Sequence, residues 1–175
     1  MTRDRFLPEP TRNTLLVLLR SRKGAVAHAE IGSAILDADW DGGLSMLSSG
    51  AVVPMLGEFF CDTPFQADRA MAELAEIGDV PLRRRDFEPK WFPVRQGAEA
   101  VGWLLANRKG AKARRLLTAR VCGELERLLH LLERARRSGF RFHLAILEPG
   151  EDRSFAGPPW KGGAGEQADE PDEAQ

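Results

Sequence analysis

The most constraining feature of the sequence is a long amphipathic segment that runs directly into an alternating one. Within residues 111–138, apolar side chains recur at steps of four, four, three and four residues: Leu117, Val121, Leu125, Leu128 and Leu132. This spacing predicts one helix with a single apolar stripe for burial against a sheet or another helix. Gly139 predicts the end of that helix, and the following "FRFHLAIL" alternates as a strand does. We therefore expect an α+β fold.

A second helix is predicted over Pro64–Ile77, because its start carries three signals. Thr63 can cap the first turn, Pro64 suits the first helical position, and Gln66 follows Thr63 at the spacing of a capping box. Gly78 predicts the C-terminal end. The apolar residues of one face are Met71, Leu74 and Ile77, with Ala67 and Ala70 beside them.

The remaining segments are shorter. Thr14–Arg20 and Ala25–Ile31 have the lengths of two strands joined by a turn, although leucine-rich composition favours helix. Ser33–Leu47 can start as a helix, Val80–Phe87 could be an edge strand, and Glu99–Gly110 indicates a strand with a short helix as the alternative. The expected architecture is a small, mostly antiparallel sheet packed by the long C-terminal helix and shorter helices.

Composition divides the chain into three parts. Residues 1–12 contain two prolines and no periodicity, which indicates a flexible arm, and residues 13–148 form a single α+β domain. Residues 149–175 are rich in proline, glycine and acids, so we expect a disordered tail. Seven acids and two bases lie in residues 150–175, which gives −5, while the 19 acids and 23 bases before them give +4.

The compartment expected from the sequence is the cytoplasm. The N-terminal residues lack the apolar core of a signal peptide, and the apolar run Leu15–Leu19 is too short to span a bilayer. Cys61 and Cys122 lie far apart without zinc-ligand spacing, which favours two free thiols. A net charge of −1 argues against a membrane surface or nucleic acid as the partner.

The stretch "ILDADWDGGLSML" resembles the start of a calcium-binding loop. Asp37, Asp39 and Asp41 fill the first, third and fifth positions, and Gly42 fills the position of the sharp turn. The twelfth position, which normally supplies a bidentate carboxylate, is Ser48. We therefore expect an acidic turn at the end of a helix, and no metal site.

Catalytic motifs are absent from the sequence. His28, His130 and His143 belong to no nucleophile or metalloprotease pattern, and there is no phosphate-binding or dinucleotide-binding glycine motif. Cys122 and His130 are eight residues apart on one predicted helix, a rise of about 12 Å, which is too far for a catalytic pair. We expect no enzymatic activity and no cofactor, although a chain with 26 acids leaves a carboxylate pair open.

A winged-helix-like DNA-binding regulator is the main functional alternative. It requires helices in residues 14–35, followed by a recognition helix in "DADWDGGLSMLSSG", where three carboxylates would repel phosphates. Arg83–Arg85 and Arg108–Arg115 could contact phosphates, but the overall charge is not basic, which favours solvated surface arginines instead.

Several segments, in order, resemble a family of immunity proteins from bacterial polymorphic-toxin systems, often numbered seventy. The similar stretches are "EIGS" (30–33), "VPMLGEFF" (53–60), "AMAELAEI" (70–77), "RDFEPKW" (85–91), "WLLANRKG" (103–110) and "FHLAIL" (142–147). The resemblance covers roughly residues 25–147 and implies a non-catalytic protein that binds and neutralises a cognate toxin.

A binding role needs buried anchors and a charged rim. The residues that combine those chemistries, and that we expect to contact the partner, are Asp37, Asp39, Trp40, Asp41, Arg83, Arg84, Arg85 and Trp91.

Overall fold

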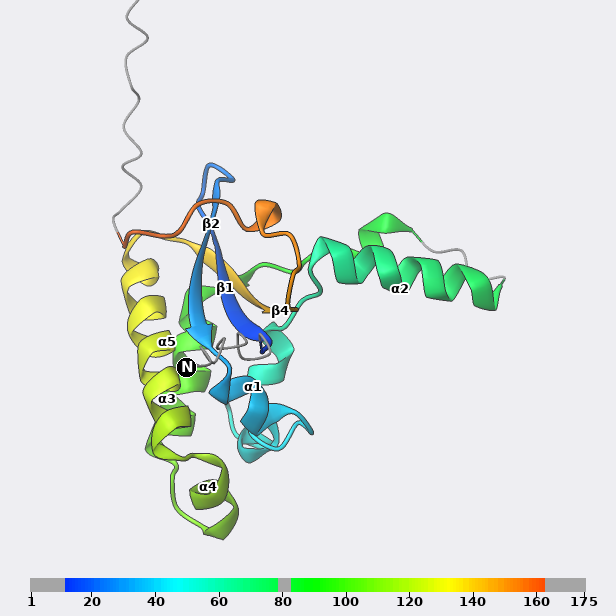
Figure 1. Ribbon diagram of the computed structural model, residues 1–175. Coiled ribbons are helices and arrows are strands. Elements are labelled where there is room, and N and C mark those ends of the chain that lie inside the picture. Colours follow the sequence, from blue (N-terminus) through cyan, green and yellow to red (C-terminus); the bar gives the residue numbers. More distant parts are fainter. Residues whose placement is uncertain (1–11, 79–82, 163–175) are drawn as a thin grey trace, which may run out of the picture.

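The computed structural model describes residues 12–78 and 83–162, which fold around one four-stranded sheet (Figure 1). The strands and α-helices, in chain order, are β1 (Thr14–Arg20), β2 (Val26–Gly32), α1 (Ala34–Asp39), α2 (Pro64–Ile77), β3 (Phe92–Pro93), α3 (Val94–Ala106), α4 (Ala111–Leu116), α5 (Ala119–Arg137) and β4 (Arg141–Leu147). Short 3-10 helices lie at Ser45–Ser48, Leu56–Phe59, Arg84–Phe87 and Ser154–Ala156. None of the described helices is long and apolar enough to cross a membrane.

The sheet is antiparallel, with strand order β2-β1-β4-β3. The expected α+β fold with a small antiparallel sheet is confirmed. Residues 14–31 form strands, so the helical interpretation of that segment is wrong. Each residue of Leu15–Leu19 is at most 2% exposed, which shows that β1 is covered on both faces and that its leucines serve a buried strand.

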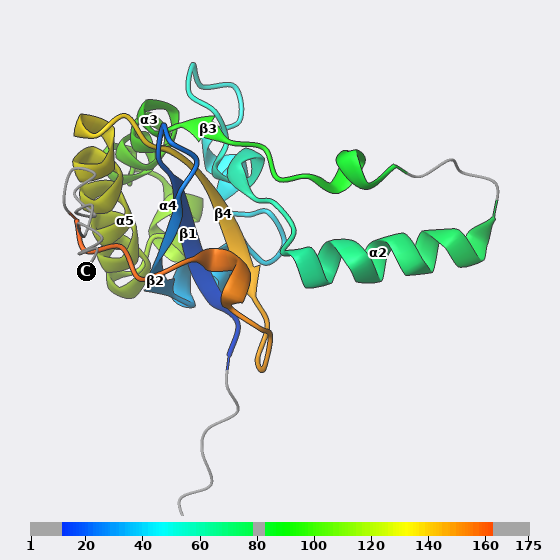
Figure 2. The same ribbon diagram turned by 90° about the horizontal axis from the view of Figure 1, so that it is seen from above.

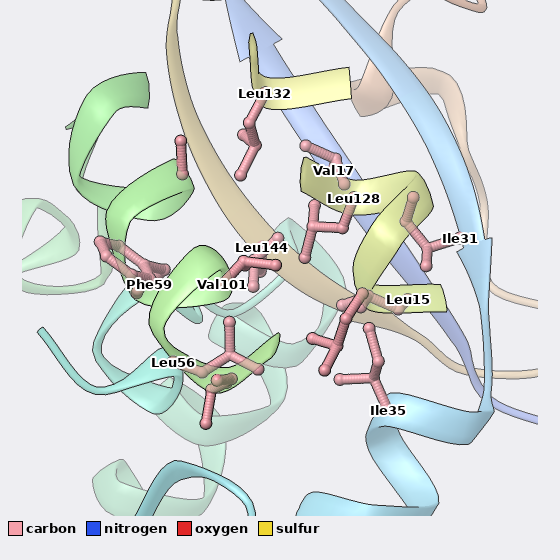
Figure 3. Close-up of a cluster of buried hydrophobic side chains, with 14 of the residues drawn as sticks. Leu15, Val17, Ile31, Ile35, Leu56, Phe59, Val101, Leu128, Leu132 and Leu144 are labelled. Atoms are coloured by element: carbon pink, nitrogen blue, oxygen red, sulfur yellow. The ribbon is translucent and has the colours of Figure 1, made fainter. Parts of the chain in front are cut away.

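One face of the sheet packs on α3 and α5 (Figures 1 and 2). Figure 3 shows Val17 and Leu144, which pair across β1 and β4, close to Leu128 of α5 and Val101 of α3. The stripe predicted on the long C-terminal helix lies in this core. The stripe, the sheet and α3 together form the main hydrophobic core of the described fold.

The strand predicted over Glu99–Gly110 is wrong, because α3 extends to Ala106 and includes most of this segment, so the helix alternative is correct there. The apolar run "VGWLL" is short enough for a strand, but the stripe begins earlier, at Val94, and continues through Gly97 and Val101. A side chain on Gly97 would meet the ring of Phe142. The glycine therefore lets α3 lie close to β4.

The predicted helix over residues 111–138 is interrupted. Leu117 and Thr118 separate α4 from α5, and the Thr118 hydroxyl accepts a hydrogen bond from Val121 N (3.3 Å), starting a new helix. The edge strand predicted at Val80–Phe87 is also wrong where it is described, since Arg84–Phe87 form a 3-10 helix. Residues 79–82 lie outside the described residues.

The second face of the sheet is covered by residues 153–160, here called the strap. Ala156 is fully buried and Phe155 packs beside it against Leu16 and Leu18, as does Trp91. At the edge of the sheet, His28 N donates to Pro158 O (3.0 Å) and Trp160 N donates to His28 O (2.7 Å). The predicted disorder is therefore wrong for residues 149–162, because apolar anchors and backbone pairing offset the entropy of ordering. Residues 163–175, and residues 1–11 of the predicted arm, lie outside the described residues.

His143 is the one described side chain with a buried polar atom that finds no hydrogen-bond partner. It lies opposite Leu18 on the second face, is 4% exposed, and contacts Trp91 with 4.5 Å between ring centroids. Burial lowers the pKa of His143 from 6.5 to about 4. The imidazole is therefore neutral in the folded protein at pH 7, and the Arg20 guanidinium lies over the Trp91 ring (5.6 Å).

We expect the free energy of unfolding to fall as the pH drops. The unfolded imidazole, with a pKa of 6.5, binds a proton before the folded one, with a pKa of about 4. Between pH 7 and pH 5 this difference removes about 2 kcal/mol of stability. Urea unfolding at several pH values measures the slope; His143→Leu should lose this contribution and the exposed His130→Gln should keep it. An unchanged slope in His143→Leu contradicts the assignment.

The strap can be tested with two glycines that share a positive φ. Gly150 (φ 79°) has open space where a Cβ would project, whereas a Cβ on Gly157 (φ 68°) would meet Val26 O. We expect Gly150→Ala to cost about 1 kcal/mol from backbone strain and Gly157→Ala to cost more than about 3 kcal/mol. Urea unfolding followed by circular dichroism compares them, and equal costs would mean that the strap is not packed as described.

Candidate partner-binding surface

The acidic turn after α1 is held by hydrogen bonds to its own chain. Asp39 Oδ1 accepts from Ser45 N (2.7 Å) and Oδ2 accepts from Ser45 Oγ (2.6 Å). The same Ser45 Oγ accepts from Gly57 N (2.8 Å), so the Asp39 carboxylate links α1 to the 3-10 helix at Leu56–Phe59. This network fixes the path of the chain where α1 ends.

The other two aspartates differ from Asp39. Asp41 Oδ1 accepts from Gly43 N (3.0 Å) in a local turn, and Asp37 is exposed on α1. No group of three potential metal ligands gathers among residues 12–78 and 83–162. Asp39 and Asp41, two of the three carboxylates in the calcium-like stretch, therefore accept hydrogen bonds from backbone amides of the turn.

Between these two aspartates, Trp40 points into solvent and is 85% exposed. Met46 is 53% exposed and Val52 is fully exposed. We call residues 40–52, which carry these three side chains, the display loop. A tryptophan that moves from water into an interface removes on the order of 200 Å² of surface, worth about 5 kcal/mol. Exposed aromatic and methionine side chains grouped in this way are typical of interaction surfaces.

Helix α4 brings basic residues beside the display loop. A Cβ on Gly43 would lie 3.5 Å from Leu116 Cδ1, which places the end of α4 against the turn. Lys112, Arg114 and Arg115 on α4 are exposed. The acidic turn thus borders the second basic cluster of the sequence, Arg108–Arg115.

The eight residues predicted to contact a partner fall into three places in the fold. Asp37, Asp39, Trp40 and Asp41 lie together at the end of α1. Arg83 and Arg85 are exposed on the segment that follows α2, together with the backbone of Arg84. Trp91 is half-buried on the second sheet face against His143. The structure therefore does not join Trp91 or the three arginines to the turn around Trp40.

Sequence reasoning missed Met46 and Val52 as exposed apolar residues. Neither residue was singled out, although they lie in "ILDADWDGGLSML" and "AVVPMLGEFF". The available signal was the intervening "SSG", since apolar residues beside a run of serine and glycine lie in a loop at the surface.

The three histidines have different surroundings, and both cysteines are free thiols. His28 Nδ1 lies 2.9 Å from Gly157 O, His130 is exposed, and His143 contacts Trp91. Cys122 is buried with Sγ 3.5 Å from Leu117 O, and burial raises the pKa of the half-buried Cys61 thiol. Among the described residues, neither thiol is hydrogen-bonded to a histidine.

Two shallow depressions, of about 450 and 480 Å³, flank α5. The first contains Glu124, Glu148 and Glu151, and each carboxylate accepts hydrogen bonds from the chain itself: Glu124 from Ile35 N (2.9 Å), Glu148 from Arg69 (2.9 Å) and Glu151 from Glu148 N (3.0 Å). The second contains His130 without a serine, threonine or cysteine beside it.

No family model, no curated protein and no solved structure matches this chain.

Replacing Asp39 should destabilise the protein, because Ser45 N and Oγ would lose their acceptor at a residue that is 7% exposed. We expect Asp39→Ala to cost roughly 1–3 kcal/mol and the matched Asp37→Ala to change stability by less than about 0.5 kcal/mol. Urea unfolding measures both. Equal effects, or a melting temperature that rises with millimolar calcium in the wild type, would show that the acids do something other than hold the turn.

Proposed function

We propose that this protein is a non-catalytic binding protein that neutralises a cognate bacterial toxin, with the display loop as the contact surface. The observation that carries the proposal is Trp40, which is 85% exposed on a turn fixed by Asp39 and Ser45. The resemblance of residues 25–147 to immunity proteins supplies the class of partner.

Preorganisation supports a binding role for this surface. A tryptophan on a rigid turn loses little conformational entropy when it binds, and such residues dominate the free energy of many interfaces. The polar groups nearest to Trp40 are already paired within the chain, so they lose few hydrogen bonds to water on binding. Asp37 on one side and α4 on the other offer a charged rim of both signs, which would steer association.

The DNA-binding alternative loses its structural basis. It needs two helices within residues 14–35, and most of that segment forms β1 and β2. In the place of the recognition helix stands the turn around Trp40, which carries the carboxylates of Asp39 and Asp41. A gel shift at low salt tests the point, since binding to phosphates is strongest there.

The decisive experiment measures binding to the C-terminal domain encoded by the neighbouring gene. We expect Trp40→Ala to weaken binding by about tenfold or more, measured by calorimetry, with an unchanged melting temperature. Phe65→Ala is the matched control, because Phe65 is 57% exposed but lies on α2, away from the display loop.

Two results would overturn the proposal. Trp40→Ala could bind as tightly as the wild type, which would remove the display loop from the interface. The neighbour's domain could be harmless when expressed without this protein, which would remove the role in immunity.

A further inference from the structure

Helix α2 projects sideways from the body of the protein in both views (Figures 1 and 2). It has 14 residues, about 21 Å of helix, and in both views its outer half lies away from the α-helices and strands of the body. Its direction is nevertheless fixed. The root is held by side-chain hydrogen bonds to the end of β4 and the loop after it: Thr63 to Glu151, Gln66 to Ile146 O (2.7 Å) and Arg69 to Glu148 (2.9 Å).

The apolar face of α2 is exposed towards the tip of the helix. Ala67, at the root, is 7% exposed, Leu74 is 38% exposed and Ile77, at the tip, is 78% exposed. Ala70 and Met71, on the same face by helical spacing, are half-buried. The exposure of this apolar stripe rises with distance from the body. Its outer half therefore lacks a packing partner among the described residues.

We call α2 together with residues 83–90 the arm. Its two segments carry net charges of opposite sign. Residues 64–77 contain three acids (Asp68, Glu73 and Glu76) against Arg69, which gives −2. Residues 83–90, which run back along the arm towards β3, contain four bases against Asp86 and Glu88, which gives +2. Arg83, Arg85 and Lys90 among them are exposed.

We propose that the arm binds the arm of a second copy of this chain, with the two α2 helices antiparallel about a two-fold axis. A two-fold interface requires a patch that is complementary to itself. The apolar stripe meets its own copy, and the basic residues 83–90 of each copy lie beside the acidic α2 of the other. A partner of a different kind would have to supply both charges, whereas a second copy already carries them.

This dimer is independent of the proposed toxin binding. Trp40 lies at the end of α1, and both arms use α2 and residues 83–90. A failure of either proposal therefore leaves the other standing.

Sedimentation velocity of the full chain across the micromolar range tests the dimer. We expect the wild type to dimerise as its concentration rises. The double variant Leu74→Glu/Ile77→Glu should be monomeric at every concentration, because each lost anchor weakens the interface by about tenfold or more. Both side chains are exposed in the single copy, so the variant should keep its fold, which circular dichroism checks.

Phe65→Glu is the matched control, since Phe65 is 57% exposed on the opposite face of α2 and should leave the dimer intact. Arg85→Glu should raise the dimer dissociation constant, and so should added salt, because the two charged segments attract one another. A wild type that is monomeric throughout overturns the proposal. So does a dimer that survives Leu74→Glu/Ile77→Glu, or one that is lost in Trp40→Ala.

Discussion

The fold depends on the burial of β1 on both faces. Five consecutive apolar residues, Leu15–Leu19, leave this strand no solvent-facing side, so the sheet needs a layer on each face. Helices α3 and α5 form one layer and supply most of the buried area. The strap and Trp91 form the other layer with few apolar side chains, and the strap also pairs with the outer edge of β2. Residues 153–160 are therefore ordered by tertiary contacts, in which Phe155 and Ala156 cover β1 and the backbone pairs with β2.

Acidic side chains hold much of the irregular structure in place. Asp39 joins α1 to the 3-10 helix at Leu56–Phe59, Glu124 accepts from the first turn of α1 (2.9 Å), and Glu148 and Glu151 hold the root of α2. In each case a carboxylate accepts from a backbone amide, a hydroxyl or a guanidinium of a distant segment. Such charge-assisted bonds are stronger than neutral ones. Both surfaces proposed for binding, the display loop and the arm, are held in place by hydrogen bonds of this kind.

Local signals in the sequence predicted an element correctly where that element contained its own capping residues or its own apolar pattern. The capping box of α2 is present, with Thr63 and Gln66 in their expected roles, and the lengths of β1 and β2 decided correctly against helix. The α3 helix was misread because its stripe begins at Val94, inside a proline-rich stretch, and the strap because its order comes from tertiary contacts. For the candidate site, the sequence could single out Trp40 and its aspartates. It could not show that Asp39 bonds with Ser45, six residues away, or that Trp91 turns towards His143, because both depend on tertiary contacts.

The exposed position of Trp40 also has an optical consequence. The chain contains four tryptophans and no tyrosine, so its near-ultraviolet emission comes almost entirely from indoles in different surroundings. Trp91 contacts an imidazole, Trp160 lies under the Arg134 guanidinium at 5.5 Å, and Trp103 packs at the edge of the core. Trp40 alone among the four is exposed (85%), and indole emission moves to shorter wavelength when water leaves the ring. A partner that covers the display loop should therefore shift the emission of Trp40 to shorter wavelength, so binding can be followed without an added label.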